Sequence, residues 1–332
     1  MLGAKLRLSL IVFSCTLTQS VLRDAPFALA EDFDLYYLGG QSNMEGFGSI
    51  GELSEEQAKA VPNVFIFHTQ PLPDQQEFNP RSQWQPLKPG HGTGFRVDGS
   101  QPQLSNRFGV ELSLGRHLSK LRPERKIALV KYARNGSSID AQARGHWGCW
   151  EPDFDSGDGD YSDQNQYDYF LATLRSAMQV SDIDGDGETD RLIPRGIVCM
   201  QGESDGAHTR EIAERYEANL KRMTDLFRAA LRSDDLPIVV GRISYSDPKP
   251  EKRIWKHGEI IREAQAAFCR KDPAARLVTT TDSYSYSDPA HYDSAGYLDL
   301  GTQFAEALVE LQSSQNDNGD RTPTQAGKQS QP

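Results

Sequence analysis

Three side chains of this sequence have the types that activate a hydroxyl group for attack on a carbonyl carbon: a serine, a histidine and an aspartate. Ser42 follows an apolar run and two glycines, which tolerate the positive φ of a sharp turn. Asp288 and His291 lie close together near the end of the chain. A histidine base oriented by a carboxylate is the usual partner of a nucleophilic serine. The candidate roles are therefore Ser42 as nucleophile, His291 as base and Asp288 as orienting acid.

Each of these residues also has an ordinary structural explanation. Ser42 could be a helix N-cap, since serine is favoured at helix starts, and His291 could simply hydrogen-bond Asp288 within a loop. A rival nucleophile is Ser204 in the segment 202–206, which fits the G-x-S-x-G pattern of the α/β-hydrolase elbow. That fold normally carries its acid and histidine on separate loops, and no HGGG-type oxyanion segment precedes Ser204. The rival also leaves the residues around Ser42 unexplained.

Short apolar runs alternate with helical patterns along the chain, and together they must position these residues. The expected strands are 33–38, 64–67, 127–132, 196–201, 238–243 and 277–281, and the expected helices are 106–121, 167–180, 212–231, 255–270 and 294–311. Strands that alternate with helices need crossover connections, which predicts an α/β fold: a doubly wound parallel sheet sandwiched by helices, in a single domain with long loops. Sites in such sheets form at the carboxyl ends of the strands, where the candidates lie.

The candidate residues resemble motifs of the SGNH hydrolase superfamily, and within it of the sialate O-acetylesterase-like carbohydrate esterases, which include acetylxylan esterase-type enzymes. The GQSN, QGE and DxxH blocks of that family appear in the correct order at 40–44, 201–205 and 288–291. One block alone is a weak signal, but three in series are fairly specific. The Phe-Gly-Pro-Glu segment of the family appears at 108–111 without its proline. The resemblance spans about residues 33–311.

This resemblance implies a serine esterase that removes O-acetyl groups from carbohydrates, either acetylated polysaccharide or sialic-acid-like sugars. It assigns Ser42, His291 and Asp288 to the catalytic triad, with no cofactor required for catalysis. Asn43, Glu203 and Asp205 are expected to support the site by hydrogen bonding.

The resemblance also implies an oxyanion hole, built from the backbone N–H groups of Ser42 and Gly136 and the side-chain amide of Gln201. Gly109 is the alternative to Gly136. A second class of function is a non-catalytic glycan-binding module that keeps the same scaffold. Such a module would need a broken triad, and all three triad residues are present.

An aspartate-rich run has the spacing of a calcium-binding loop. Asp182, Asp184 and Asp186 supply oxygens at positions 1, 3 and 5, and Asp190 falls at position 9. Position 12, where a bidentate glutamate should lie, is Ile193. The run predicts a structural calcium site if an acid from elsewhere completes it, and a solvated turn otherwise.

The composition argues against nucleic acid as a partner, and it leaves the role of two tryptophans undecided. The formal net charge of −11 disfavours binding to nucleic acid, which depends on Lys and Arg neutralising phosphates. The expected partner is an acetylated carbohydrate. Trp147 and Trp150 lie in a long loop and could stack on sugar rings or plug the loop onto the core; the sequence favours neither.

The two ends of the chain differ from the rest. Residues 1–30 carry Lys5 and Arg7, an apolar stretch and an A-x-A sequence at 28–30, which predicts a cleavable signal peptide and a secreted or periplasmic protein. We expect no association with the membrane after its removal. The esterase domain is expected at 31–312, and the polar tail 313–332 is predicted to be disordered.

Overall fold

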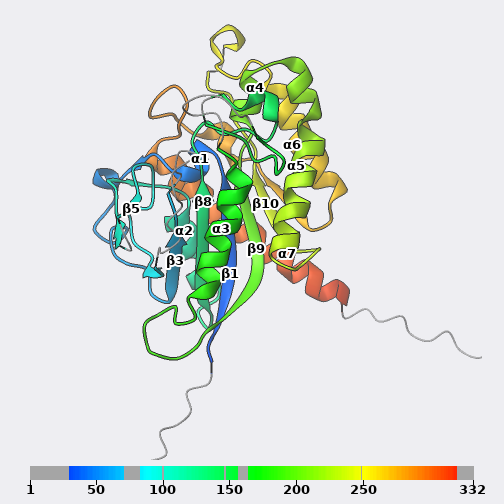
Figure 1. Ribbon diagram of the computed structural model, residues 1–332. Helices are drawn as coiled ribbons and strands as arrows, with labels where there is room; N and C mark the ends of the chain where they lie inside the picture. Colours follow the sequence, from blue (N-terminus) through cyan, green and yellow to red (C-terminus); the bar gives the residue numbers. More distant parts are fainter. Residues whose placement is uncertain are drawn as a thin grey trace, which may run out of the picture.

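A seven-stranded sheet runs through the protein (Figure 1). The computed structural model describes residues 30–70, 83–98, 101–145, 147–155, 164–247 and 249–319. The spatial order of the strands is β11 (Ala275–Val278), β10 (Ile238–Gly241), β9 (Arg191–Met200), β1 (Asp32–Gly40), β8 (Lys126–Ala133), β3 (Val64–His68) and β4 (Gln85–Pro86). All neighbours are parallel except β4, which pairs antiparallel with β3. The prediction of a doubly wound α/β sheet is confirmed.

Strand β1 lies where the chain changes direction across the sheet. Strands β8 and β3 lie on one side of it, whereas β9, β10 and β11 lie on the other. The connection that leaves β1 runs towards β3, whereas the one that leaves β9 runs towards β10, so the two diverge at the carboxyl ends of these neighbouring strands. Ligands of open α/β sheets bind at such a point, and the candidate nucleophile follows β1 directly.

Helices cover both faces of the sheet (Figure 1). Helices α2 (Glu111–Leu121) and α7 (Ser294–Gly319) pack together on one face. Helices α3 (Gln166–Gln179) and α5 (Arg210–Ala230) cover the other, and α6 (Gly258–Lys271) packs beside α5. The remaining short elements are α1 (Ser42–Glu45), α4 (Glu203–Ala207), the ribbon of β2 (Gly48–Ser49) and β7 (Arg107–Phe108), the ribbon of β5 (Arg96–Asp98) and β6 (Gln101–Gln103), and the 3-10 turns η1 (Ile50–Glu52), η2 (Ala141–Ala143), η3 (Pro250–Lys252) and η4 (Thr280–Ser283).

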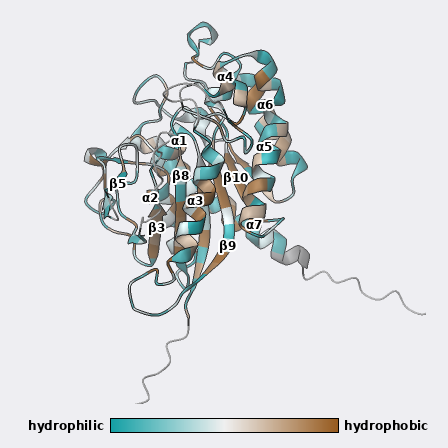
Figure 2. Ribbon diagram, in the orientation of Figure 1, coloured by the Kyte–Doolittle hydropathy of each residue, from teal (hydrophilic) through white to brown (hydrophobic). Residues whose placement is uncertain are grey.

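The core lies on both sides of β1. This strand is buried along nearly its whole length, as expected of a central parallel strand with helices on either face. The ring of Tyr37 packs at 4.5 Å from Phe170 of α3 and at 5.1 Å from Phe227 of α5, measured between ring centroids. Hydrophobic residues follow the central strands, and the helices carry a mixture of hydrophobic and hydrophilic residues (Figure 2). The nucleophile segment thus follows a rigid strand.

Two helix boundaries differ by more than three residues from the sequence expectation. Helix α2 begins at Glu111 rather than at 106, because residues 107–108 pair with β2 instead. Helix α7 continues through Gly319, whereas the sequence predicts a disordered tail from residue 313. Its polar side chains are tied down by hydrogen bonds, from Gln312 Nε2 to Arg195 O (2.8 Å) and from Gln315 Nε2 to Asp235 O (2.9 Å).

The predicted signal peptide, residues 1–30, lies outside the described part of the chain except for Ala30. Residues 320–332 also lie outside the described part. Within the described part, no helix is both long and apolar enough to cross a membrane. Among the described residues, Cys149, Cys199 and Cys269 are free thiols.

Candidate active site

Ser42 begins the four-residue helix α1 at the carboxyl end of β1. Gly40 makes this turn possible: its φ is 145°, and a Cβ there would lie 2.0 Å from Met200 O on the neighbouring strand. The N-cap of α1 is Gln41, and no side chain caps the helix, which removes the capping explanation for Ser42. Ser42 is 4% exposed, and its N–H group has no acceptor among the described residues.

Asp288 and His291 form a hydrogen-bonded pair in the loop between β11 and α7. His291 Nδ1 lies 2.8 Å from Asp288 Oδ2 and 3.0 Å from Oδ1. An ionised carboxylate only accepts, so Nδ1–H donates and neutral His291 keeps Nε2 free to accept a proton. Burial acts to raise the pKa of Asp288, but the hydrogen bonds from the His291 ring and from the backbone hold that pKa below its usual value. The acid is thus kept ionised beside the base.

Asn43 joins the three sequence blocks by hydrogen bonds. Its Nδ2 donates to Glu203 Oε1 (2.8 Å) of the second block and to Ala290 O (3.4 Å) of the third. Its Oδ1 accepts from Tyr292 N (3.4 Å) and from Tyr297 OH (2.8 Å). The residue after the candidate nucleophile therefore bonds to the residues on both sides of the candidate base.

The serine and the histidine themselves make no direct hydrogen bond within the described structure. Catalytic hydrogen bonds are often long in unliganded enzymes and tighten when substrate binds. The hydrogen bonds of Asn43 bring together the segments that carry Ser42 and His291, but Ser42 Oγ and His291 Nε2 are not hydrogen-bonded to each other.

Glu203, which we expected to support the site, is buried beside Asn43. It is 4% exposed, and Asn43 is the partner of its Oε1, while its Oε2 has no partner. Burial raises the pKa of this carboxyl group, and the hydrogen bond from Asn43 opposes that rise. Its contacts are those of a support for Asn43.

Gly136 lies in a loop that is held against α1. Its φ is 73°, and its N–H group has no acceptor among the described residues. The preceding Asn135 donates its N–H to Glu45 Oε2 (2.7 Å) at the end of α1. The following Ser137 hydroxyl accepts from Trp150 Nε1 (2.9 Å). The Gly136 N–H is therefore held beside the nucleophile helix and is available to a ligand.

Gly109, the alternative to Gly136, does not offer its N–H group. That N–H donates to Glu111 Oε1 (2.8 Å), and Glu111 Oε2 is paired with Lys131 Nζ (2.7 Å). Lys131 is fully buried and also donates to the carbonyl oxygens of Glu45 (2.9 Å) and His91 (2.7 Å). The buried pair of Lys131 and Glu111 therefore holds the end of α1 through Glu45 O and uses the Gly109 N–H group as a donor.

The side chain of Gln201 is fully buried and already hydrogen-bonded. Its Nε2 donates to Asp205 Oδ2 (2.6 Å) and lies 3.4 Å from both Ser137 O and Gln41 Oε1, while its Oε1 accepts from Tyr216 OH (2.8 Å). The expected oxyanion donor thus points at protein oxygens. Its contacts are those of a support.

Asp205, which we expected to support the site as Glu203 does, lies in the same block. It is 1% exposed and accepts hydrogen bonds from Ile139 N (3.1 Å) and Asp140 N (2.9 Å), just after the Gly136 loop. Burial raises its pKa to about 7, although these hydrogen bonds and the one from Gln201 act to lower it. Asp205 thereby ties the QGE block to the Gly136 loop.

Ser204 lies inside helix α4, and its N–H donates to Gln41 Oε1 (3.2 Å). A nucleophile elbow places its serine on a strained turn between strand and helix. Among the described residues the positive-φ positions other than glycine are Asn63 and Arg232, so Ser204 has no such strain. This geometry favours Ser42 over Ser204.

The two tryptophans have different environments. Trp150 is 1% exposed and plugs the core, as the structural explanation required. Trp147 is 38% exposed and lies against Gly136, where a Cβ would be 2.1 Å from the Trp147 Cδ1 atom. Arg134 lies over the indole ring at 4.6 Å. A partly exposed aromatic ring, with Arg134 over it, therefore borders the loop that carries Gly136.

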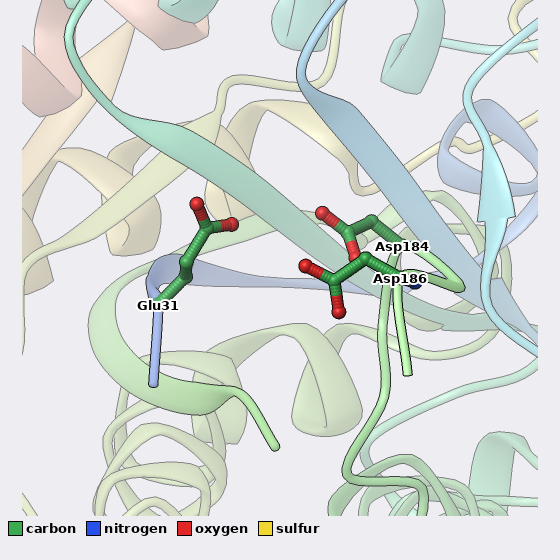
Figure 3. Close-up of side chains that lie close together, drawn as sticks. All are labelled: Glu31, Asp184 and Asp186. Atoms are coloured by element: carbon green, nitrogen blue, oxygen red, sulfur yellow. The ribbon is translucent and has the colours of Figure 1, made fainter. Parts of the chain in front are cut away.

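The predicted calcium loop brings acids together at the opposite end of β1 (Figure 3). Two overlapping groups have carboxylate oxygens within 4.8 Å of one another: Asp182, Asp184 and Asp190 in one, and Glu31, Asp184 and Asp186 in the other. Glu31 is an acid from elsewhere in the chain, as position 12 required. Carboxylate oxygens suit calcium, but the Lys126 ammonium group is already paired with Asp184 (2.5 Å) and with Glu31. Calcium here stays a prediction.

Comparisons with known proteins agree with this geometry. Residues 32–310 match the family described as carbohydrate esterase, sialic acid-specific acetylesterase, which confirms the resemblance drawn from the three sequence blocks. No curated protein matches the chain.

Solved structures share the fold at low sequence identity. A protein from Arabidopsis thaliana is 18% identical, with a TM-score of 0.56 over 85% of this chain and 99% of that one. NanS is 15% identical, with a TM-score of 0.55 over 86% and 100%. XAC1771, a carbohydrate acetylesterase from Xanthomonas citri, is 18% identical with a TM-score of 0.52 over 85% of this chain, which covers only 56% of that protein.

Proposed function

Because the chain belongs to this family of carbohydrate esterases, which remove O-acetyl groups from carbohydrates, we propose that Ser42, His291 and Asp288 carry out its reaction. The observation that supports this most strongly is the hydrogen bonding of Asn43 to both later blocks. It brings the serine and the histidine to one end of the sheet.

The reaction proceeds by acyl transfer through the serine. Ser42 Oγ attacks the carbonyl carbon of the acetyl ester while His291 Nε2 takes the hydroxyl proton, and Asp288 stabilises the imidazolium that forms. The tetrahedral intermediate then collapses, and the imidazolium gives its proton to the departing sugar hydroxyl. Water attacks the acetyl-serine with His291 as base again, which releases acetate and restores Ser42.

Two backbone donors stabilise the oxyanion of the intermediate. The N–H groups of Ser42 and Gly136 are proposed for this role, because both lack acceptors among the described residues. Gln201 supports these donors indirectly, by its hydrogen bond to Asp205, since its amide already faces protein oxygens. Asn43 and Glu203 hold the segments in place. The chemistry needs no metal; calcium, if bound, has a structural role.

The substrates are acetylated polysaccharides or sialic-acid-like sugars, and the protein meets them outside the cytoplasm. The family description supports acetylated sugars, and the sequence of residues 1–30 supports export to the periplasm or the medium. The partly exposed ring of Trp147 beside Gly136 provides an aromatic surface on the side where the alcohol part of the ester would lie.

The test compares two serine variants with p-nitrophenyl acetate as substrate. Ser42→Ala should lower kcat by several orders of magnitude with an unchanged melting temperature, because triad members act as a unit. Ser204→Ala is the matched control and should retain most activity. An inactive Ser204 variant beside an active Ser42 variant would replace this mechanism by the α/β-hydrolase one. His291→Ala should match Ser42→Ala, and Asp288→Asn should retain more activity.

A further inference from the structure

The ring of Phe47 lies flat on the imidazole of His291. The ring centroids are 3.5 Å apart and the planes differ by 4°. Phe47 is half-buried, and the sequence motifs around the nucleophile do not include it. The contact joins a residue just after α1 to the candidate base at the other end of the chain.

The imidazole needs a contact on its face because its other restraints act on one edge. Asp288 binds Nδ1, and the same carboxylate accepts the backbone N–H of Ala290 (2.8 Å) and of His291 (3.0 Å). The loop lies at the surface: the Asp288 side chain is 43% exposed and that of His291 is 12% exposed. A ring held at one edge can tilt about that edge, so a flat surface on its face is what fixes its plane.

Phe47 is itself well fixed relative to the nucleophile. Gly46 N donates to Ser42 O (2.8 Å), and Phe47 O accepts from Arg107 Nη1 (2.8 Å). A Cβ on Gly46 would lie 2.3 Å from the Gly109 Cα atom, so this segment packs closely against its neighbour. One short segment therefore carries both Ser42 and the ring on which His291 rests.

We propose that Phe47 is a positioning residue that sets the plane of the His291 ring so that Nε2 faces Ser42. The inference rests on the proposed function, in which His291 is the base. The aromatic face also attracts the imidazolium that forms when Ser42 is deprotonated, because the face of an aromatic ring carries partial negative charge. Both effects act during proton transfer and leave substrate binding unchanged.

The first experiment measures kcat and KM for p-nitrophenyl acetate in variants at position 47. Phe47→Leu keeps an apolar side chain but loses the flat ring, and kcat should fall by about 10- to 100-fold with KM within about twofold, as for a small misplacement of a reacting group. Phe47→Tyr keeps the ring and should retain kcat within about threefold. Phe65→Leu is the matched control, because Phe65 is a half-buried aromatic that packs edge-on against Phe33 in the body of the sheet; its kcat should not change.

The second experiment is a double-mutant cycle with His291→Ala. If Phe47 acts only through the imidazole, Phe47→Leu has no further effect on the residual rate in the His291→Ala background. An equal loss of kcat in both backgrounds overturns the proposal, as does an unchanged kcat or a raised KM in Phe47→Leu alone. Phe47→Met provides a second flexible side chain of similar volume if the leucine variant melts early.

The cycle also tests the role of His291 as base separately from the role of Phe47 in positioning it. An active His291→Ala variant refutes the proposed base, and the role of Phe47 with it. An inactive His291→Ala variant beside a fully active Phe47→Leu variant refutes the role of Phe47 alone.

Discussion

His91 should make the folded protein sensitive to mild acid. Its side chain is 1% exposed, and both ring nitrogens are buried without a hydrogen-bond partner. Burial, and then the positive charge of nearby Lys131, lower its pKa from 6.5 to about 3. His91→Phe replaces the imidazole by an apolar ring and removes this titration from the folded state.

The magnitude follows from the difference in proton binding between the two states. The unfolded chain protonates His91 below its ordinary pKa of about 6.5, whereas the folded protein keeps it neutral down to a pKa of about 3. Between these limits the unfolded state binds one proton more, so the free energy of unfolding falls as pH falls, by ~1.4 kcal/mol per pH unit. The loss from His91 alone is ~2 kcal/mol at pH 5.

The assay is urea unfolding of the parent and of His91→Phe, each at pH 7 and pH 5. The variant should lose ~2 kcal/mol less free energy of unfolding between these pH values than the parent does. The difference between proteins is the quantity to compare, because Asp205, with its pKa raised to about 7, contributes in the opposite direction in both. His208→Gln, at an exposed position, is the control and should behave like the parent.

Equal losses in the parent and in His91→Phe would refute the reasoning, because they would mean that His91 is already protonated or hydrated in the folded state. If His91→Phe is too large for its site, His91→Leu gives the same comparison with a smaller side chain.

Three further results are expected. Asp205→Asn should lower kcat by about 10- to 100-fold with little change in KM, because an amide nitrogen replaces one of the two oxygens that accept hydrogen bonds from the backbone after Gly136 and from Gln201; unchanged steady-state kinetics would show that the loop holds without it. If Asp182, Asp184 and Asp190 bind calcium, excess EDTA should lower the melting temperature of metal-loaded protein, whereas activity at low temperature should persist; an unchanged melting temperature would make this a surface turn. Acetyl esters should be hydrolysed faster than butyryl and octanoyl esters of the same alcohol, in a graded series worth ~1 to 3 kcal/mol per methylene, and faster turnover of octanoyl esters would contradict an acetyl pocket.

The strands and long helices were predictable because each is encoded by a local pattern. Apolar runs separated by amphipathic segments gave the parallel sheet, and the strand from Arg191 to Met200 differs from its prediction mainly in its start. Residues 107–108 were assigned to a helix because their strand character depends on pairing with β2, which no local pattern reveals. The continuation of α7 past residue 311 was not predicted because Gln312 and Gln315 bond to distant carbonyl oxygens, which no local pattern reveals.

The candidate site was predictable to the extent that its residues fall in short blocks. The pair of Asp288 and His291 is local in sequence, so its hydrogen bond could be expected. The contacts of Asp205 with the Gly136 loop and the stacking of Phe47 arise only when distant segments meet. The sequence does contain a sign of the buried ion pair: Lys131 is a charged residue within an apolar strand, and a buried charge requires a partner.

The bonds of Asn43 have a consequence for how the protein acquires activity as it is made. The nucleophile is synthesised early, but the base lies on the last loop before α7 and is secured only when Ala290 and Tyr292 reach Asn43. A chain that stops short of this loop contains every strand of the seven-stranded sheet but lacks the base. Enzymatic activity therefore reports the docking of the final segment, and a kinetic refolding experiment should show the far-UV signal returning before ester hydrolysis does.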